Sequence, residues 1–451
     1  MKQYDLIVIG GGPAGYLAGE RAGHAGLKTL VIEKRALGGV CLNEGCIPSK
    51  SFLYCAKVFD YTKHAGDYGI SLENAKLDHA AVVKRKNKVV NTLVSGIGAA
   101  LKGLKVDVVQ GVAAIERKTA DGYVVSAGQE QFVADKLLIA SGSVPVLPPI
   151  DGLADSVKSG YALTNREILD IETVPPELVI VGGGVIGLEM ASYFNSAGSK
   201  VTVIEMLPYI GGNCDREIAE TLKAEYEKKG VKFLLNSRVT RIADGKVTYD
   251  GGEVSADKVL LSIGRRAFTE GLGLENIGVL TERGKIITDR YMRTNLPGVY
   301  AAGDVNGKLM LAHTAYRETE VAINNILGKR DVMRYDAIAS VIYTNPEVGS
   351  VGLTEEQCRE QKIEYKVGKA SAMYSGRYVA ENLKGSGFCK VLCDKKTDKL
   401  LGVHILSSYA SEMIVGAALM LEMEMTVEDI KELVFPHPTV CEIIREAIFA
   451  I

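Results

Sequence analysis

Two cysteines five positions apart, Cys41 and Cys46, are the side chains in this sequence best suited to redox chemistry. Along an ideal α-helix, Cα atoms at this spacing are about 8.7 Å apart, whereas a disulfide needs less than about 7 Å. If the two cysteines bond, the segment between them is therefore not a regular helix. Gly45 inside the segment, and Gly38 and Gly39 before it, supply the backbone freedom that such a break requires.

The cysteine pair has three interpretations. It could be two unrelated buried thiols, or half of a zinc site, although no second Cys or His pair at ligand spacing accompanies it. A redox-active disulfide is favoured over both because the pair lies just after a glycine-rich motif of the kind that binds dinucleotides.

Glycine-rich turns of the form G-x-G-x-x-G occur twice, each after a short apolar run and before a helical stretch. The first glycine permits a tight turn, the second lets the backbone approach a pyrophosphate, and the third lets helix and strand pack closely. The helix that follows offers free N–H groups to the phosphates. Each turn therefore predicts a βαβ unit that binds a dinucleotide. The glycines are Gly10, Gly12 and Gly15 in the first motif and Gly182, Gly184 and Gly187 in the second.

An acidic residue follows each motif at the same distance, Glu33 after the first and Glu205 after the second. A carboxylate at this position can accept hydrogen bonds from a ribose 2′-hydroxyl and would repel a 2′-phosphate. Residues 206–213 contain no Lys or Arg that could neutralise such a phosphate, so Glu205 predicts NAD rather than NADP. At Glu33, the adjacent Lys34 and Arg35 could neutralise such a phosphate, so the first motif does not distinguish a ribose 2′-hydroxyl from a 2′-phosphate.

His437 is a candidate base near the end of the chain. A single histidine is more often structural, but Pro436 and Pro438 restrict the backbone on either side of this one, and Glu442 follows five positions on. An acid within reach of a histidine is the arrangement of a base with an orienting partner, which thiol chemistry requires.

The chain has 451 residues, enough for two to four domains. A proline-rich stretch around residues 145–149 predicts a boundary near residue 147, and the pattern changes at about residue 335 to that of a separate α+β domain. We expect strands at 6–9, 29–32, 178–181 and 201–204 around the motifs, strands at 339–343, 388–393 and 400–406, and helices at 412–423 and 441–450.

Composition excludes several classes of protein. Hydrophobic residues make up 47 % and charged residues 24 % of the chain, and the net charge is −2, so no basic surplus indicates nucleic acid as a partner. No apolar run is long enough to span a membrane, and the N-terminal apolar run is too short for a signal peptide. We therefore expect a cytoplasmic protein that binds neither membrane nor nucleic acid.

Together, the cysteine segment, the two glycine motifs and the histidine segment resemble the pyridine nucleotide–disulfide oxidoreductase family over essentially the whole chain. The resemblance implies an α/β fold with two Rossmann-like dinucleotide-binding domains and a C-terminal α+β dimerisation domain. An FAD-binding domain would comprise residues 1–146 and 265–334, an NAD-binding domain residues 147–264, and the interface domain residues 335–451.

The same resemblance assigns catalytic roles. Cys46 would be the charge-transfer thiolate beside the flavin, and Cys41 the interchange thiol that meets the substrate. Lys50 would lie near the flavin, paired with Glu189. The base, His437 oriented by Glu442, would come from the other subunit of a homodimer.

Cofactor contacts are also implied by the resemblance, and no metal is expected. The FAD residues would be Gly10, Gly12, Gly15, Glu33, Lys50, Gly111, Ser141, Gly142, Asp304 and Ala312. The NAD residues would be Gly182, Gly184, Gly187, Glu205, Val239 and Gly264.

Within the family, the motifs are most similar to those of the enzymes that oxidise protein-bound dihydrolipoamide to lipoamide with NAD. The partner would be a lipoyl-bearing protein of a 2-oxo-acid dehydrogenase or glycine cleavage system. Phe435 departs from the polar residue common in such enzymes and leaves the fit of the substrate open. A relative that acts on another disulfide or a quinone, and a scaffold subunit, are the alternatives.

Overall fold

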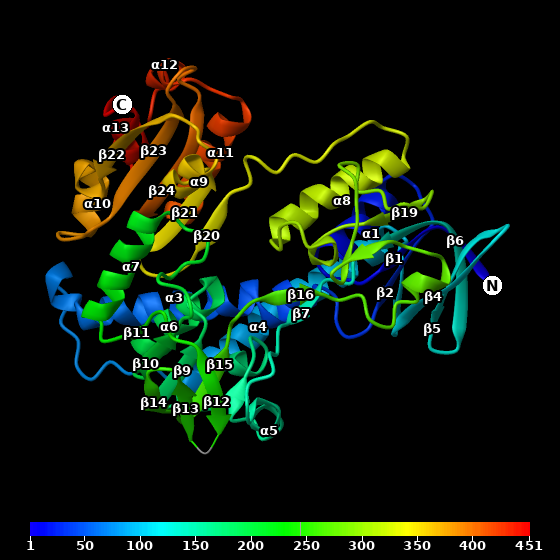
Figure 1. The fold of residues 1–451 in the computed structure, drawn as a ribbon, viewed down its shortest axis with the longest axis horizontal. Coiled ribbons are helices and arrows are strands. Elements are labelled where there is room, and N and C mark those ends of the chain that lie inside the picture. The colour runs from blue at the N-terminus through cyan, green and yellow to red at the C-terminus, as the bar shows by residue number, and fades with distance from the viewer. Residues whose placement is uncertain (244) are drawn as a thin grey trace. The chain divides into compact units, whose positions relative to one another are not determined.

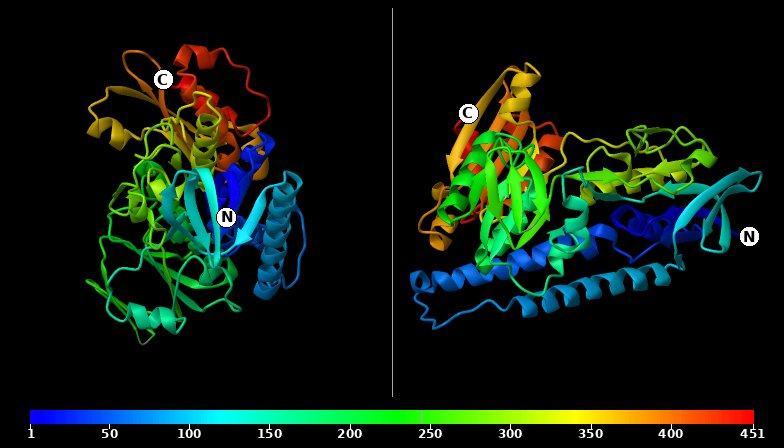
Figure 2. Two further views of the ribbon diagram at one scale, coloured as in Figure 1. Left: turned by 90° about the vertical axis from the view of Figure 1, so that its right-hand side faces the viewer. Right: turned by 60° about the horizontal axis from the view of Figure 1, so that its bottom comes forward.

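The computed structural model describes residues 1–243 and 245–451, which form two compact units (Figure 1). Unit 1 comprises Met1–Ser51, Ala80–Leu147 and Gly264–Arg334. Unit 2 comprises Phe52–His79, Pro148–Ile263 and Tyr335–Ile451. The long helices α3 (Cys46–Lys63) and α4 (His79–Gly103), visible in Figure 2, each contain a boundary between the two units.

Unit 1 is built on a seven-stranded sheet in the order β3-β2-β1-β6-β5-β4, with β19 paired to β6. Strands β1, β2, β3, β6 and β19 pair in parallel, whereas β4 and β5 continue the sheet antiparallel. The order reverses at β1, and ligands of open α/β sheets bind at the carboxyl ends of strands at such a reversal. The strands are β1 (Lys2–Ile9), β2 (Thr29–Glu33), β3 (Asp107–Gln110), β4 (Ala113–Thr119), β5 (Gly122–Ala127), β6 (Glu130–Ile139) and β19 (Val299–Ala301).

Helices α1 (Pro13–His24) and α8 (Ala312–Ile326) of unit 1 lie side by side (Figure 1). The Thr319 hydroxyl on α8 donates to the Ala14 carbonyl on α1 at 3.2 Å. Unit 1 also contains the short helix α2 (Gly39–Glu44) and two two-stranded sheets, which pair β7 (Ser143–Pro145) with β16 (Arg265–Ala267) and β17 (Thr281–Glu282) with β18 (Lys285–Ile286).

Unit 2 contains a second parallel sheet, ordered β11-β10-β9-β15-β8, that repeats the reversal of unit 1 at β9. Its strands are β8 (Ala162–Leu163), β9 (Glu177–Val181), β10 (Lys200–Ile204), β11 (Lys232–Leu234) and β15 (Lys258–Leu261). An antiparallel sheet of β12 (Val239–Ala243), β13 (Lys246–Tyr249) and β14 (Gly252–Ser255) accompanies it, with helices α5 (Leu153–Lys158), α6 (Val185–Ala197) and α7 (Arg216–Lys228).

The C-terminal part of unit 2 is an antiparallel sheet in the order β20-β21-β24-β23-β22. The strands are β20 (Ser340–Ile342), β21 (Glu347–Gly352), β22 (Tyr365–Ser371), β23 (Phe388–Asp394) and β24 (Leu400–Ser407). The helices are α9 (Glu355–Glu360), α10 (Gly376–Glu381), α11 (Ala410–Glu422), α12 (Val427–Lys431) and α13 (Glu442–Phe449).

A buried ionic cluster joins this sheet to α7 within unit 2. The Lys390 ammonium on β23, 2 % exposed, lies 2.9 Å from Asp215, which caps α7, and 2.8 Å from Glu355 on α9. Glu217 is a third partner at 2.9 Å. Burial would lower the pKa of Lys390, but the carboxylates outweigh it and raise that pKa. The lysine therefore stays charged and holds the two parts of unit 2 together.

The predicted α/β fold class is confirmed, and each predicted strand and helix coincides with an observed element to within a few residues. Segment 52–79 belongs by its contacts to unit 2, which also contains the parts predicted as NAD-binding and interface domains. The limits of those three domains stay predictions.

Candidate redox and dinucleotide-binding site

The first glycine motif makes the tight turn that its sequence predicts. After β1 ends, Gly10 adopts φ +105°, and a Cβ there would lie 2.3 Å from the Ala140 carbonyl oxygen. A Cβ on Gly15 would lie 1.7 Å from the Gly10 carbonyl oxygen. Side chains are thus excluded at both positions, because α1 and the end of β6 approach β1 too closely.

Gly12, the N-cap of α1, is in a different environment. A Cβ on Gly12 would meet nothing closer than the Gly39 Cα at 3.7 Å, and no side chain caps the helix. The space over the N-terminus of α1 is therefore open to a ligand phosphate, as a dinucleotide site requires. The protein's own packing does not demand glycine here, whereas the approach of a pyrophosphate does.

Glu33, at the end of β2, organises this turn. Its carboxylate accepts hydrogen bonds from the Gly11 N–H at 2.7 Å and the Arg35 N–H at 2.8 Å. The Gly111 N–H donates to the Glu33 carbonyl at 2.9 Å, so the structure brings these two predicted residues together. A carboxylate fixed by two backbone donors keeps lone pairs for ribose hydroxyls.

Asp304 belongs to a second network in unit 1. The Ser143 hydroxyl donates to its carboxylate at 2.5 Å, and the Arg265 guanidinium donates to that hydroxyl at 2.8 Å. The Glu318 carboxylate, fully buried on α8, accepts the Gly303 N–H at 2.6 Å and so braces the turn before Asp304. Sequence reasoning missed Ser143 and Glu318, because neither belongs to a recognisable motif.

Three other residues predicted for FAD also lie in unit 1. The Ser141 hydroxyl donates to the Phe268 carbonyl at 2.6 Å, and the Phe268 N–H donates to the Gly142 carbonyl at 2.9 Å. Ser141 and Gly142 thus hold in place the segment that follows β6 and lies beside Gly10. Ala312 is the first residue of α8, and no side chain caps that helix end.

The second motif repeats this geometry in unit 2. Gly182 adopts φ +106°, with the Ser262 carbonyl oxygen 2.6 Å from an added Cβ, and a Cβ on Gly187 would lie 2.1 Å from the Gly182 carbonyl oxygen. Gly184, the N-cap of α6, has nothing within 4 Å of its added Cβ. Packing thus requires glycine at positions 182 and 187, whereas Gly184 leaves room for a ligand.

Glu205 plays the role in unit 2 that Glu33 plays in unit 1. Its carboxylate accepts the Gly183 N–H at 2.7 Å and the Leu207 N–H at 2.8 Å. Val239 begins β12 and is buried in the core of unit 2. Gly264 is the first residue of the last segment of unit 1, and its carbonyl accepts the Val146 N–H at 3.1 Å.

The helix breaks between the two candidate redox cysteines. Helix α2 ends at Glu44, Gly45 adopts φ −150° and ψ −109°, and α3 begins at Cys46. The two cysteines are thiols whose side chains hydrogen-bond each other. This hydrogen bond, together with burial, raises the pKa of Cys41, and the positive charge of Lys50 acts in the opposite direction. The segment from Cys41 to Cys46 is therefore not one regular helix, as bonding of the two cysteines requires, although only Gly45 lies outside a helix.

Lys50 lies one turn into α3 from Cys46, so both are on the same face of the helix. Glu189 is buried on α6 of unit 2, where one carboxylate oxygen accepts the Tyr343 N–H at 3.1 Å. The pairing of Lys50 with Glu189 stays a prediction. In the described part of the chain, no three His, Cys, Asp or Glu side chains are arranged to hold a metal ion.

His437 and Glu442 form the predicted pair in unit 2. His437 Nδ1 lies 2.9 Å from Glu442 Oε1, and the Thr439 N–H donates to Glu442 Oε2 at 2.9 Å. Burial would raise the pKa of Glu442, but the hydrogen bonds from Thr439 and His437 outweigh it and lower that pKa. The ionised carboxylate accepts the proton of Nδ1, which leaves Nε2 as the basic atom. The His437 side chain is 76 % exposed, so this atom is accessible to a partner or substrate.

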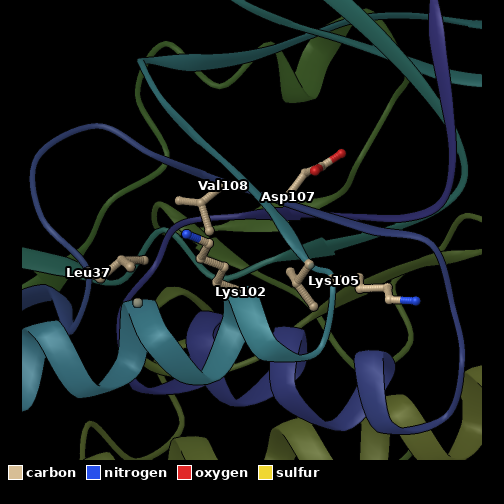
Figure 3. Close-up of a pocket in the computed structure, with 7 residues that line it drawn as sticks. Leu37, Lys102, Lys105, Asp107 and Val108 are labelled. Carbon is tan, nitrogen blue, oxygen red and sulfur yellow. The ribbon is translucent and has the colours of Figure 1, made fainter.

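A cavity of about 380 Å³ also lies in unit 1 (Figure 3). Leu37 lies at one side of it, and Lys102, Lys105, Asp107 and Val108 are on the other. Its lining residues include neither a cysteine nor a histidine. None of the candidate redox, base or cofactor-binding residues lines this cavity.

Comparison with known families and proteins agrees with this geometry. The family described as "Pyridine nucleotide-disulphide oxidoreductase" matches residues 4–319, and its dimerisation domain matches residues 338–448. The chain is 40% identical to the dihydrolipoyl dehydrogenase of Mycoplasma pneumoniae over 98% of this chain and 97% of the relative. It is also 40% identical to the mitochondrial dihydrolipoyl dehydrogenase of Pisum sativum, over 99% of this chain and 91% of the relative.

Two solved structures have the same fold. LpdA from Mycobacterium tuberculosis superposes with a TM-score of 0.89 at 26% identity, covering 100% of this chain and 99% of the other. The HOCl-induced flavoprotein disulfide reductase RclA from Escherichia coli superposes with a TM-score of 0.86 at 27% identity, covering 99% and 98%. The chain belongs to the pyridine nucleotide–disulphide oxidoreductase family, and it is an oxidoreductase.

The contrast between Gly184 and Gly187 yields a test of the NAD site. Gly184→Ala should leave the melting temperature unchanged, because the added methyl group has open space, and weaken NAD binding at least about tenfold by obstructing the pyrophosphate. Gly187→Ala should destabilise the protein by about 1–3 kcal/mol through overpacking. Thermal unfolding and titration calorimetry measure the two effects. Unchanged NAD affinity in Gly184→Ala would contradict the assignment.

The His437–Glu442 pair predicts a defined titration. Because the pKa of Glu442 is lowered in the folded protein, its stabilising contribution is present above the ordinary value of 4.5 and is lost as the pH falls through the lowered value. Carbon-13 NMR of labelled Glu442 should show a carboxyl that titrates below 4.5. His437→Ala should raise this pKa, because one of its hydrogen-bond donors is removed. Titration at or above 4.5 in the unmodified protein would refute the pairing.

Proposed function

We propose that this chain is a dihydrolipoyl dehydrogenase, which oxidises protein-bound dihydrolipoamide to lipoamide and reduces NAD+ to NADH. The observation that carries the proposal is the meeting of Cys41 and Cys46 at the Gly45 break, directly after a dinucleotide motif. Relatives of that name at 36–40% identity over nearly the whole chain support it.

The enzyme uses FAD and NAD. When bound, they supply the two-electron chemistry that connects the thiol pair to the nicotinamide. The residues fit these groups, since both helix N-termini are open above Gly12 and Gly184, and a carboxylate fixed by backbone donors lies at the end of β2 and directly after β10. The fixed carboxylate of Glu205 selects NAD, because a 2′-phosphate would be repelled there.

The thiol–disulfide exchange involves only Cys41, Cys46 and the two thiols of the substrate. A dihydrolipoyl thiolate attacks the Cys41 sulfur of a Cys41–Cys46 disulfide, and the bond to Cys46 breaks with release of the Cys46 thiolate. The second dihydrolipoyl thiolate then attacks its own partner sulfur, closes the lipoyl ring and releases Cys41. The substrate loses two electrons and two protons, and the cysteine pair gains the two electrons.

The protons need an acceptor, which is the role of His437. With Nδ1 held by Glu442, Nε2 takes the proton of the first substrate thiol, releases it to solvent, and then takes the proton of the second thiol. In a homodimer, the base at each cysteine pair is His437 of the partner subunit. Each active site is then completed only by association of two copies.

The dimerisation domain carries an apolar surface suited to that association. Val415 and Leu419 on α11 and Met423 at its end are spaced four residues apart on one helix face and are 70%, 62% and 66% exposed. An apolar stripe of this kind marks an interaction site. We assign it to the contact with a second copy of the chain, because this segment matches the family's dimerisation domain.

The proposed chemistry also requires a partner that carries the substrate. A lipoyl-bearing protein of a 2-oxo-acid dehydrogenase or glycine cleavage system would deliver the dihydrolipoyl group, and we place the enzyme in the cytoplasm. Among the residues that the structure describes, no helix combines the length and apolar character needed to cross a bilayer. Co-purification with a lipoyl-bearing protein tests the partner.

A second candidate is a reductase of another disulfide. The similarity to RclA, a flavoprotein disulfide reductase, supports this candidate. RclA is 27% identical to this chain, whereas the dihydrolipoyl dehydrogenase of Mycoplasma pneumoniae is 40% identical. The disulfide reductase is therefore the second candidate.

The principal test is turnover of dihydrolipoamide. The purified enzyme should reduce NAD with dihydrolipoamide, and Cys46→Ser should abolish this activity because no disulfide can form. Cys55→Ser, a cysteine later on the same helix, is the matched control and should retain it. The assay compares reduction of NAD or NADP by dihydrolipoamide with reduction of glutathione disulfide and quinones by NADH or NADPH. Faster turnover with another disulfide would favour the second candidate, faster turnover with a quinone would contradict both candidates, and full activity in Cys46→Ser would refute both.

The dimer has its own test. Leu419→Arg should convert the dimer to a monomer and reduce dihydrolipoamide turnover by about 10²-fold or more, because the base of the partner subunit is lost. Leu280→Arg, at a similarly exposed leucine in unit 1, should change neither. Sedimentation velocity measures the association. A fully active monomer would show that the base comes from the same chain.

A further inference from the structure

A chain of hydrogen bonds leads to the Asp304 carboxylate from the ribbon of β7 and β16 in unit 1. The Arg265 guanidinium donates through Nε to the Ser143 hydroxyl at 2.8 Å, and through Nη2 to the Ser143 carbonyl, also at 2.8 Å. The Ser143 hydroxyl donates to Asp304 Oδ2 at 2.5 Å. Ser143 is only 5 % exposed, so its hydroxyl is shielded from water. The three side chains therefore form one continuous and mostly sheltered chain.

The chemistry of the three groups sets the direction of the hydrogen bonds. A guanidinium can only donate, and an ionised carboxylate can only accept. Because Arg265 Nε donates to the Ser143 oxygen, the single hydrogen of that hydroxyl is directed to Asp304. Hydrogen bonds in a chain polarise one another, so a hydroxyl that accepts from a cation becomes a stronger donor. Asp304 is thus held at one oxygen by a directed donor.

The ribbon fixes this donor independently of the hydroxyl. Strands β7 and β16 pair antiparallel, and backbone hydrogen bonds continue the pairing at both ends. The bond from Arg265 to the Ser143 carbonyl adds a side-chain link across the ribbon. Since that link uses the backbone of Ser143, it persists when the hydroxyl is removed. Replacing Ser143 by alanine therefore interrupts the chain to Asp304 and leaves the ribbon paired.

Asp304 lies beside the helix ends where a dinucleotide is expected. Gly303, the residue before it, adopts φ +80°, and a Cβ there would lie 3.4 Å from the Ala14 Cβ on α1 and 3.4 Å from the Ala315 Cβ on α8. The turn therefore packs against the first turns of both helices, neither of which has a side-chain cap. Asp304 is partly exposed, unlike Ser143. Its carboxylate keeps lone pairs for the hydroxyls of a ligand.

We propose that Ser143, directed by Arg265, is a positioning residue for FAD, which holds the Asp304 carboxylate ready to accept a hydroxyl of the cofactor's ribityl chain. The inference rests on the proposed function, in which this unit binds FAD. The Glu318 carboxylate, which accepts the Gly303 N–H, fixes the backbone of the turn, and Ser143 fixes the side chain. A carboxylate that is already held loses less conformational freedom on binding than a mobile one.

The test follows release of FAD from the loaded protein. Exchange of bound FAD for an excess of isotope-labelled FAD, read by native mass spectrometry, gives the release rate. Ser143→Ala should release FAD about tenfold faster, because the Asp304 carboxylate is no longer held. The matched control is Ser126→Ala, since the Ser126 hydroxyl also donates to a carboxylate, that of Glu116, in the antiparallel part of the unit 1 sheet. It should release FAD at the unmodified rate.

A second background separates positioning from a loss of packing. In Asp304→Ala, Ser143 has no carboxylate to hold, so adding Ser143→Ala should change the release rate by less than about twofold. A loss of packing would instead accelerate release equally in both backgrounds. Equal acceleration would overturn the inference, and so would an unmodified release rate in Ser143→Ala.

These measurements are independent of the proposed reaction, because FAD release is followed without dihydrolipoamide. A protein that shows the tenfold effect of Ser143→Ala but fails to reduce NAD with dihydrolipoamide would support the inference and refute only the proposed function. A protein that turns over dihydrolipoamide but releases FAD at the same rate with and without the Ser143 hydroxyl would refute only the inference.

Discussion

The break in the helix at Gly45 is the constraint on which the chemistry depends. A continuous helix from Gly39 to Lys63 would hold the two sulfur atoms too far apart to bond. With the break, Cys46 becomes the first residue of a new helix and Cys41 remains in the preceding short one, and their side chains meet. Everything proposed for thiol exchange needs this local departure from regular structure.

Close backbone approaches hold the surroundings of that break in place. In both dinucleotide motifs, the first and third glycines are required by neighbouring carbonyl oxygens, whereas the middle glycine faces open space. The same pattern in units 1 and 2 separates two physical reasons for glycine. The outer positions maintain the packing of strand and helix, and the middle position keeps room for a ligand.

Local signals explain how much of this could be predicted from the sequence. The glycine turns, the acids that follow them and the break between the cysteines depend on residues close together in the chain, and the structure confirms their geometry. The missed contacts join residues that are distant in sequence: Ser143 and Asp304 are 161 positions apart, and Lys390 and Asp215 are 175 apart. No motif marks such pairs, because only the folded chain brings them together.

The central claim is that Cys41 and Cys46 exchange electrons with NAD through the bound cofactor. Its most direct measurement is the number of alkylated thiols in the oxidised, FAD-loaded protein with and without anaerobic NADH, assigned by mass spectrometry. We expect Cys41 and Cys46 to react with iodoacetamide only after NADH is added, while the other cysteines react equally in both samples. Equal modification of the two cysteines in both samples would contradict it.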